Sequence, residues 1–90
     1  MRSSGAKVAN AVRAGMTGVR IPGHVGTWKV VSMRPAVTPD GEATALALLE
    51  HERFPSAEII VDAYLKPRAV VCVKIRTSFE EEAESRGYRL

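Results

Sequence analysis

Cysteine, aromatic residues and long hydrophobic runs are all scarce in this sequence. Cys72 is the single cysteine, which excludes an internal disulfide and a cysteine-based zinc quartet. No apolar run approaches the roughly 18 residues of a membrane-spanning helix, so we expect no membrane partner. Aromatic residues are 6% of the 90 residues, yet hydrophobic ones reach 46%, which is typical of a globular chain. We expect one small domain, without room for a two-domain enzyme with a large substrate cleft.

Acidic residues are missing from the first 37 positions, where all the charges are basic. From residue 40 to residue 66 the balance reverses, and acidic residues outnumber basic ones. Such a chain can form a molecule with two differently charged faces, which would attract an anionic partner. It can equally pair its two stretches internally across a sheet. The sequence leaves both interpretations open, because it does not show which side chains share a face.

The first 18 residues are expected to form a basic N-terminal arm or a short helix. Ser4 is a suitable N-cap, and Val8, Val12 and Met16 would then share one helical face. The basic, acid-free composition is also found in targeting peptides, which keeps cleavage of this segment open.

Residues 19–76 are predicted to form a small β-domain of about five short antiparallel strands. The first strand is expected at 19–21 and the second at 27–33, with Trp28 and Val30 on one buried face. Pro35 predicts that the second strand leaves its ladder or lies at a sheet edge. The Pro39-Asp40-Gly41 sequence predicts a hairpin turn.

The alanine- and leucine-rich segment 43–52 is compatible with two structures. Its helix propensity is high, and Thr38 followed by Pro39 would begin a helix correctly. A helix over 39–53 would make the protein α+β. We favour a strand, because a three-strand meander buries Trp28 better.

The rest of the chain is predicted to add two strands and a helix. Strands are expected at 58–62 and 69–75, separated by one 3₁₀ turn at 63–67. Residues 77–90 are expected to form a C-terminal helix that begins at the cap Ser78, with Glu81 in the capping-box position, and ends at Gly87.

This order of strands resembles the SH3-like small barrels of the KOW type. The segment GHVGTWKVV at 23–31 is similar to their glycine-marked turn, and VDAYLK at 61–66 is similar to their closing segment. The resemblance covers residues 19–75. It implies a mainly β barrel, and a function of the kind common in KOW-type domains, which bind RNA, ribosomes or polymerase subunits.

Residues that could carry catalysis or hold a metal have simpler interpretations. His51 lies between two glutamates, but neighbouring side chains diverge, and His24 is the only other histidine. Cys72 lies in the most apolar strand, where a buried structural thiol is expected. The glycines at 23 and 26 are expected in a tight turn. We therefore expect no enzymatic activity, no cofactor and no metal.

The sequence favours a small cytoplasmic binding protein, of bacterial or phage origin, that associates with nucleic acid or a ribonucleoprotein. Basic groups supply the phosphate contacts, and His24 and Trp28 would add base stacking if exposed. The alternative is a protein–protein interaction module that uses a sheet edge or the C-terminal helix, and a homo-oligomer remains open. The candidate nucleic-acid-binding residues are Lys7, Arg13, Arg20, His24, Lys29 and Arg34.

Overall fold

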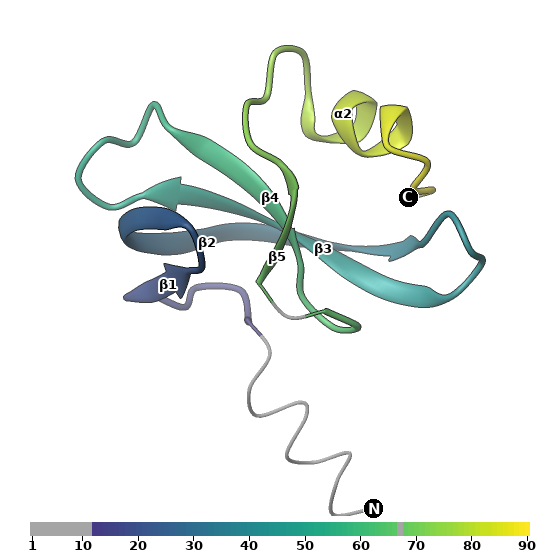
Figure 1. Cartoon of the computed structure of the whole chain (residues 1–90), viewed down its shortest axis with the longest axis horizontal. Coiled ribbons are helices and arrows are strands. Elements are labelled where there is room, and N and C mark those ends of the chain that lie inside the picture. The colour runs from purple at the N-terminus through teal and green to yellow at the C-terminus, as the bar shows by residue number, and fades with distance from the viewer. Residues whose placement is uncertain (1–11, 67) are drawn as a thin grey trace, which may run out of the picture.

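The computed structural model describes residues 12–66 and 68–90 as one antiparallel sheet followed by a helix (Figure 1). The sheet holds five strands in chain order, so each strand pairs with the next. The sheet curls into a half-barrel, which confirms the mainly β class with a short C-terminal helix. The elements are β1 (Val19–Ile21), β2 (His24–Val37), β3 (Ala43–His51), β4 (Glu58–Asp62), β5 (Ala69–Cys72) and α2 (Phe79–Ser85).

The β2–β3 hairpin forms the centre of the sheet, and β2 is twice as long as the expected strand. It continues through Pro35, which pairs with Ala45 of β3. On its other side β1 pairs only with residues 24–28, so Pro35 lies at a free edge where its missing N–H costs no ladder bond. The hairpin turn is closed by Thr38, whose Oγ1 accepts a bond from the Glu42 N–H at 3.0 Å.

The ambiguous segment is the strand β3, and the helical alternative over 39–53 is wrong. Both faces of β3 are covered. Ala47 and Leu49 are buried on one face, while Leu46 is buried on the other with Leu48 half-buried beside it. A central strand buried on both faces shows no alternation of apolar and polar residues, which explains why its sequence pattern was ambiguous.

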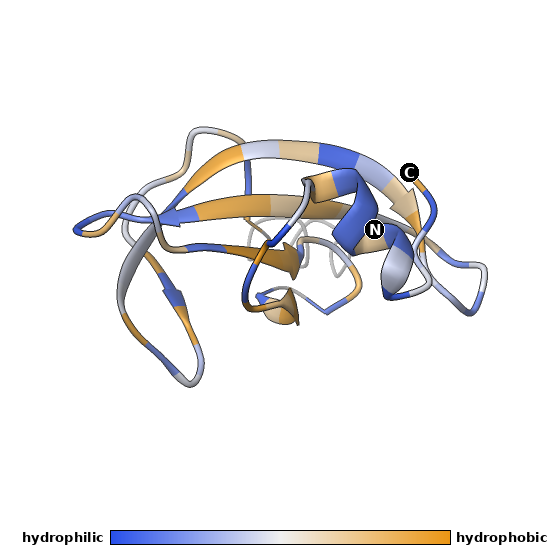
Figure 2. Cartoon of the chain, turned by 90° about the horizontal axis from the view of Figure 1, so that it is seen from above, coloured by the Kyte–Doolittle hydropathy of each residue, from blue (hydrophilic) through white to orange (hydrophobic). Residues whose placement is uncertain are grey.

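Two hydrophobic clusters lie on opposite faces of the sheet. The first core is enclosed by the curl and includes residues of β1 to β4; the second core lies between the sheet and α2. Figure 2 shows hydrophobic residues along the strands and hydrophilic ones over much of α2. The buried members of the first core are Val12, Val19, Ile21, Trp28, Val30, Ala47, Leu49, Ile59, Val61 and Ala63. Those of the second are Ala36, Leu46, Ile60, Cys72 and Ala83.

The helix α2 begins and ends at the predicted signals, within the narrower range of Phe79–Ser85. The Ser78 side chain accepts a bond from the Glu81 N–H at 3.1 Å. At the other end, Gly87 has a φ of 91°, and the Tyr88 N–H donates to the Ala83 carbonyl at 3.1 Å, as in a Schellman motif. The next residue, Arg89, forms a two-way bridge with Val37 that attaches the chain end to β2.

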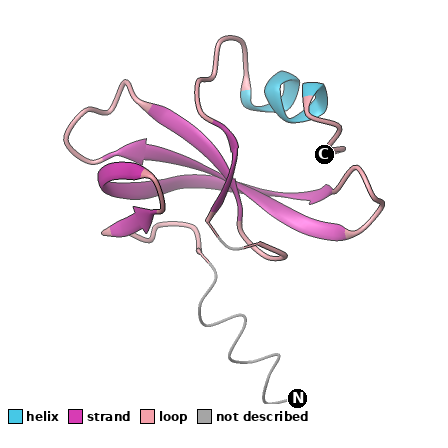
Figure 3. Cartoon of the chain, viewed as in Figure 1, coloured by secondary structure: helices cyan, strands magenta, loops and turns pink. Residues whose placement is uncertain are grey.

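The segment between β4 and β5 differs from the prediction of a 3₁₀ turn. Residues 63–66 form bends, and Figure 3 colours this connection as loop. Its shape comes from the buried carboxylate of Asp62, whose Oδ1 accepts bonds from three successive backbone N–H groups at 2.8–3.2 Å. A side chain therefore replaces the repeating backbone bonds that a 3₁₀ turn would need.

The packed domain begins before Val19. Val12 is buried in the first core, and the Val30 N–H donates to the Met16 carbonyl at 2.8 Å. Residues 12–18 contain no helix, and the part of the expected helix around Val8 lies outside the described residues. Within the described residues, no helix combines the length and the apolar surface needed to span a bilayer.

Candidate nucleic-acid interface

Two of the predicted phosphate-binding residues face acids. Lys29 is opposite Glu50 in the β2–β3 register, with Nζ 3.9 Å from Oε1. Arg34 Nη2 lies 3.3 Å from Oε2 of Glu80 in α2, and its guanidinium carbon is 6.0 Å from the Phe79 ring centroid. These two positive charges are compensated within the molecule. The pair of Lys29 with Glu50 joins the basic stretch to the acidic stretch across the sheet, whereas Glu80, the partner of Arg34, lies outside residues 40–66.

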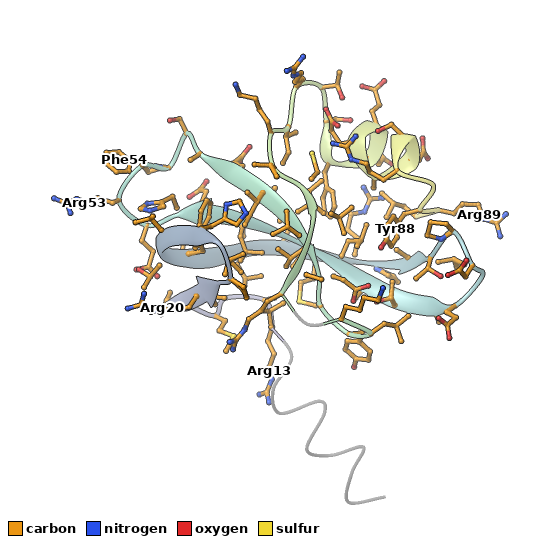
Figure 4. The ribbon with its side chains drawn as sticks, viewed as in Figure 1. Arg13, Arg20, Arg53, Phe54, Tyr88 and Arg89 are labelled. Carbon is orange, nitrogen blue, oxygen red and sulfur yellow. The ribbon has the colours of Figure 1, made fainter. Side chains whose placement is uncertain are left out.

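Two other predicted residues, Arg13 and Arg20, are exposed and take part in no ion pair within residues 12–66 and 68–90. Arg20 lies in β1 between the buried Val19 and Ile21, so its side chain points away from the first core. Figure 4 shows Arg13 and Arg20 on the side of the molecule away from α2. Lys7 lies outside the described residues.

His24 lies beside two cations, Lys66 and Arg68, that are not among the residues predicted from the sequence. These residues line an open groove of about 460 Å³ between the β1–β2 turn and the beginning of β5. The rest of its lining is Pro22, Ala69 and Val70, so none of its described lining residues is acidic. We call this feature the basic groove. It exists because, in the described chain, no ladder joins β1 to β5 and the half-barrel stays open there.

Arg68 has an unusual conformation in the basic groove. It is the non-glycine residue with a positive φ, 70°, in the described chain. Its Nε is buried and has no hydrogen-bond partner among the described residues. A left-handed backbone costs a non-glycine residue about 1 kcal/mol or more, and such strain is concentrated at functional sites.

A row of four ring side chains connects the basic groove to the tip of the β3–β4 loop. The ring centroids of His24 and Trp28 are 6.4 Å apart, those of Trp28 and His51 5.0 Å, and those of His51 and Phe54 5.3 Å. We call these four residues the aromatic row. Trp28 is only 5% exposed, so the condition for base stacking on Trp28 is not met, and its expected place on a buried face is confirmed. Phe54 is 61% exposed at the other end of the row.

His51 holds two loops together. Its Nδ1 accepts bonds from the N–H groups of Arg53 at 3.0 Å and Phe54 at 3.2 Å. Because Nδ1 is an acceptor, the proton of the neutral ring is on Nε2, which donates to the Val25 carbonyl at 3.2 Å. Gly26 has a φ of 89° and packs directly against this ring, where a Cβ would collide with it. His51 is therefore a structural residue that fixes the loop carrying Phe54.

Other residues with reactive or ligating side chains have structural roles. Cys72 is 1% exposed, as expected for a core thiol. The Glu82 carboxylate accepts a bond from the Arg76 N–H at 3.0 Å, and this bond, with Cys72 and Arg86 nearby, lowers the pKa of Glu82 despite its burial. Within the described chain, no group of three or more His, Cys, Asp or Glu residues is placed to hold a metal ion.

The surfaces expected of a protein-interaction module are partly occupied by the chain itself. Pro35 interrupts the free edge of β2, and Arg89 covers that edge at Val37. Ala83 of α2 is completely buried, so the apolar side of the helix faces the sheet.

The comparisons with known proteins find no relative of this chain. The chain matches no protein-family model, no curated protein and no solved structure. The resemblance to KOW-type barrels stays a prediction, and the basic groove and the exposed end of the aromatic row are the features that indicate a function.

Proposed function

We propose that this chain is a small, non-enzymatic protein that binds nucleic acid through the basic groove. The observation that carries the proposal is the grouping of His24, Lys66 and Arg68 around a groove whose described lining has no acid. Arg20 precedes the groove residue Pro22 by two positions, and Figure 4 shows Arg13 on the same side of the molecule as Arg20, so both would extend the contact. Each cation would contact a backbone phosphate, which gives affinity without sequence preference.

The exposed glutamates of α2, Glu80, Glu81 and Glu84, favour binding elsewhere on the molecule. Figures 1 and 4 place α2 on the side opposite Arg13 and Arg20. These glutamates would repel an anionic strand, whereas the described lining of the basic groove would attract it.

The test is fluorescence anisotropy with labelled oligonucleotides at about 50 and 200 mM salt. Three or four phosphate contacts to a single strand predict a loss of affinity of roughly 20- to 50-fold over this range. Lys66→Ala and Arg20→Ala should each weaken binding. Each should also reduce the slope of log affinity against log salt concentration by about the amount that one phosphate contact contributes.

Lys29→Ala is the matched control, because it removes the same charge from an exposed side chain that already faces Glu50. It should change the affinity by less than about twofold. No binding at low salt, or equal losses from Lys29→Ala and Lys66→Ala, would overturn the proposal.

A further inference from the structure

We infer that Phe54 is a stacking platform for an unpaired base, so that the nucleic acid bound by this chain is single-stranded. The inference rests on the proposed function and specifies its ligand. Its basis is a large aromatic side chain that is 61% exposed at the tip of the β3–β4 loop, outside both cores. Figure 4 shows Phe54 and Arg53 projecting together from this tip.

The position of Phe54 is fixed although its ring is exposed. Its backbone N–H donates to His51 Nδ1, and the two ring centroids are 5.3 Å apart with planes tilted by 41°. His51 is itself held by its bond to Val25 and by the edge contact with Trp28. A ring held in place loses little conformational freedom when a base stacks on it, so more of the stacking free energy appears as affinity.

The aromatic row places Phe54 and the basic groove on one rigid unit. His24, which lines the groove, contacts Trp28, and Trp28 contacts His51, so three packed ring pairs separate the phosphate site from the exposed ring. A strand whose phosphates occupy the basic groove would have to extend past the aromatic row to place a base on Phe54, and the packed rings keep that separation constant. This combination of a basic groove and an aromatic platform is the one used to bind single strands.

Arg53 is exposed beside Phe54 and would contact a phosphate next to the stacked base. Of the acids nearby, the Glu52 carboxylate accepts bonds from the Gly18 N–H and the Thr27 hydroxyl, and Glu50 lies 3.9 Å from Lys29. Glu58, opposite Glu50 in the β3–β4 register, is in no ion pair with a described residue. A duplex would gain nothing from Phe54, since its bases are stacked and paired within the helix.

The experiment compares three labelled probes with the same number of phosphates per strand: a single-stranded oligouridine, an abasic strand and a duplex. We expect the wild-type chain to bind the oligouridine most tightly. Phe54→Ala should weaken oligouridine binding by roughly 5- to 150-fold, which corresponds to one lost base stack. It should leave binding of the abasic strand within about twofold, because the phosphate contacts are unchanged.

Two further variants test the role of the ring itself. Phe54→Tyr keeps an aromatic face and should restore oligouridine binding to within about twofold of the wild type. Tyr64→Ala removes another exposed aromatic side chain, one that lies outside the aromatic row, and should have little effect. Circular dichroism and the emission of the buried Trp28 would show that each variant is folded.

The outcomes separate this inference from the proposed function. Salt-dependent binding that is equal for the oligouridine and the abasic strand, or that is insensitive to Phe54→Ala, overturns the stacking platform and leaves the basic groove as the binding site. Tighter binding of the duplex than of the oligouridine also overturns the stacking platform and leaves the basic groove as the binding site. No binding of any probe overturns the proposed function and, with it, this inference.

Discussion

Two sets of cations, those beside glutamates and those of the basic groove, have different electrostatic surroundings. Lys29, Arg34 and Arg86 each lie within 4.0 Å of a glutamate. Lys66 and Arg68 line a groove whose described lining has no acid, and neither is in an ion pair with any described residue, although Lys66 also borders a second cavity that acids line. The comparison shows that the number of basic residues does not identify a binding surface. What matters is whether the fold places an acid opposite each of them.

The largest expected effect tests what shapes the basic groove. Asp62→Ala removes the acceptor for the Thr44 hydroxyl and for the N–H groups of Tyr64, Leu65 and Lys66. We expect a loss of about 2–4 kcal/mol in the free energy of unfolding, because Asp62 is buried and its donors lose their partner. Urea denaturation measures it.

The control for this prediction is Asp62→Asn, which keeps an acceptor oxygen at the same position. Asp62→Asn should lower the free energy of unfolding clearly less than Asp62→Ala does. Equal losses from the two variants would show that the negative charge, rather than the hydrogen bonds, shapes the connection from β4 to β5.

A second prediction concerns the loops at the exposed end of the aromatic row. Gly26 has a φ of 89°, and the Cβ added by Gly26→Ala would collide with the His51 ring. We therefore expect Gly26→Ala to lower the free energy of unfolding by about 2–3 kcal/mol. Gly23 has a φ of 81° but open space where a Cβ would lie, and Gly23→Ala should cost only about 1 kcal/mol. The difference between the two thermal unfolding curves measures the contact with His51 and would vanish if that ring moved aside easily.

A third prediction compares two acids, Glu82 in α2 and Glu52 in the loop after β3. Bonds from backbone N–H groups, Arg76 to Glu82 and Gly18 to Glu52, hold the pKa of each carboxylate below its ordinary value of 4.5. A lowered pKa in the folded state means that the stabilisation is present above the unfolded pKa and is lost as the pH falls through the folded pKa. The stability of the wild type should therefore decrease below about pH 4.5.

Glu82→Gln and Glu52→Gln should each make the urea midpoint decrease less steeply as the pH is lowered from 6 to 3. If neither variant changes the slope, the two carboxylates titrate alike in the folded and unfolded states, and the bonds to their N–H groups are weaker than their geometry indicates.

The smallest expected effect concerns Glu50 and Glu58, which are directly opposite each other across β3 and β4. Like charges in this arrangement repel, and Lys29 compensates only one of them. Glu58→Gln should stabilise the fold by about 0.3 kcal/mol at low salt. The gain should disappear at about 1 M salt, where such interactions are screened; a gain that persists there would have another origin.

Local signals predicted those parts of the fold that depend on neighbouring residues. Ser78, Glu81 and Gly87 marked the ends of α2 correctly, because capping involves residues only a few positions apart. The strand β3 stayed ambiguous, since burial on both faces depends on α2 and on the first core. The bends after β4 were missed because the Asp62 side chain, and not a backbone repeat, organises them.

The candidate site was harder to predict for the same reason. Lys66 belongs to a stretch rich in acids, and only the curl of the sheet brings it to His24. Lys29 and Arg34 were selected for their position in a basic stretch, yet the fold places each of them opposite a glutamate. Phe54 could have been selected from the sequence, because it is an aromatic residue within the turn sequence Arg-Phe-Pro-Ser, where a core residue is not expected.

The missing ladder between β1 and β5 has a mechanical consequence. Within the described residues, backbone pairing connects the two strands only through β2, β3 and β4, so any change in the twist between neighbouring strands adds up across the sheet before it reaches them. The distance between the edges can then change without breaking a single inter-strand hydrogen bond. The width of the opening between β1 and β5 is therefore set by packing in the centre of the half-barrel rather than by hydrogen bonds across the opening.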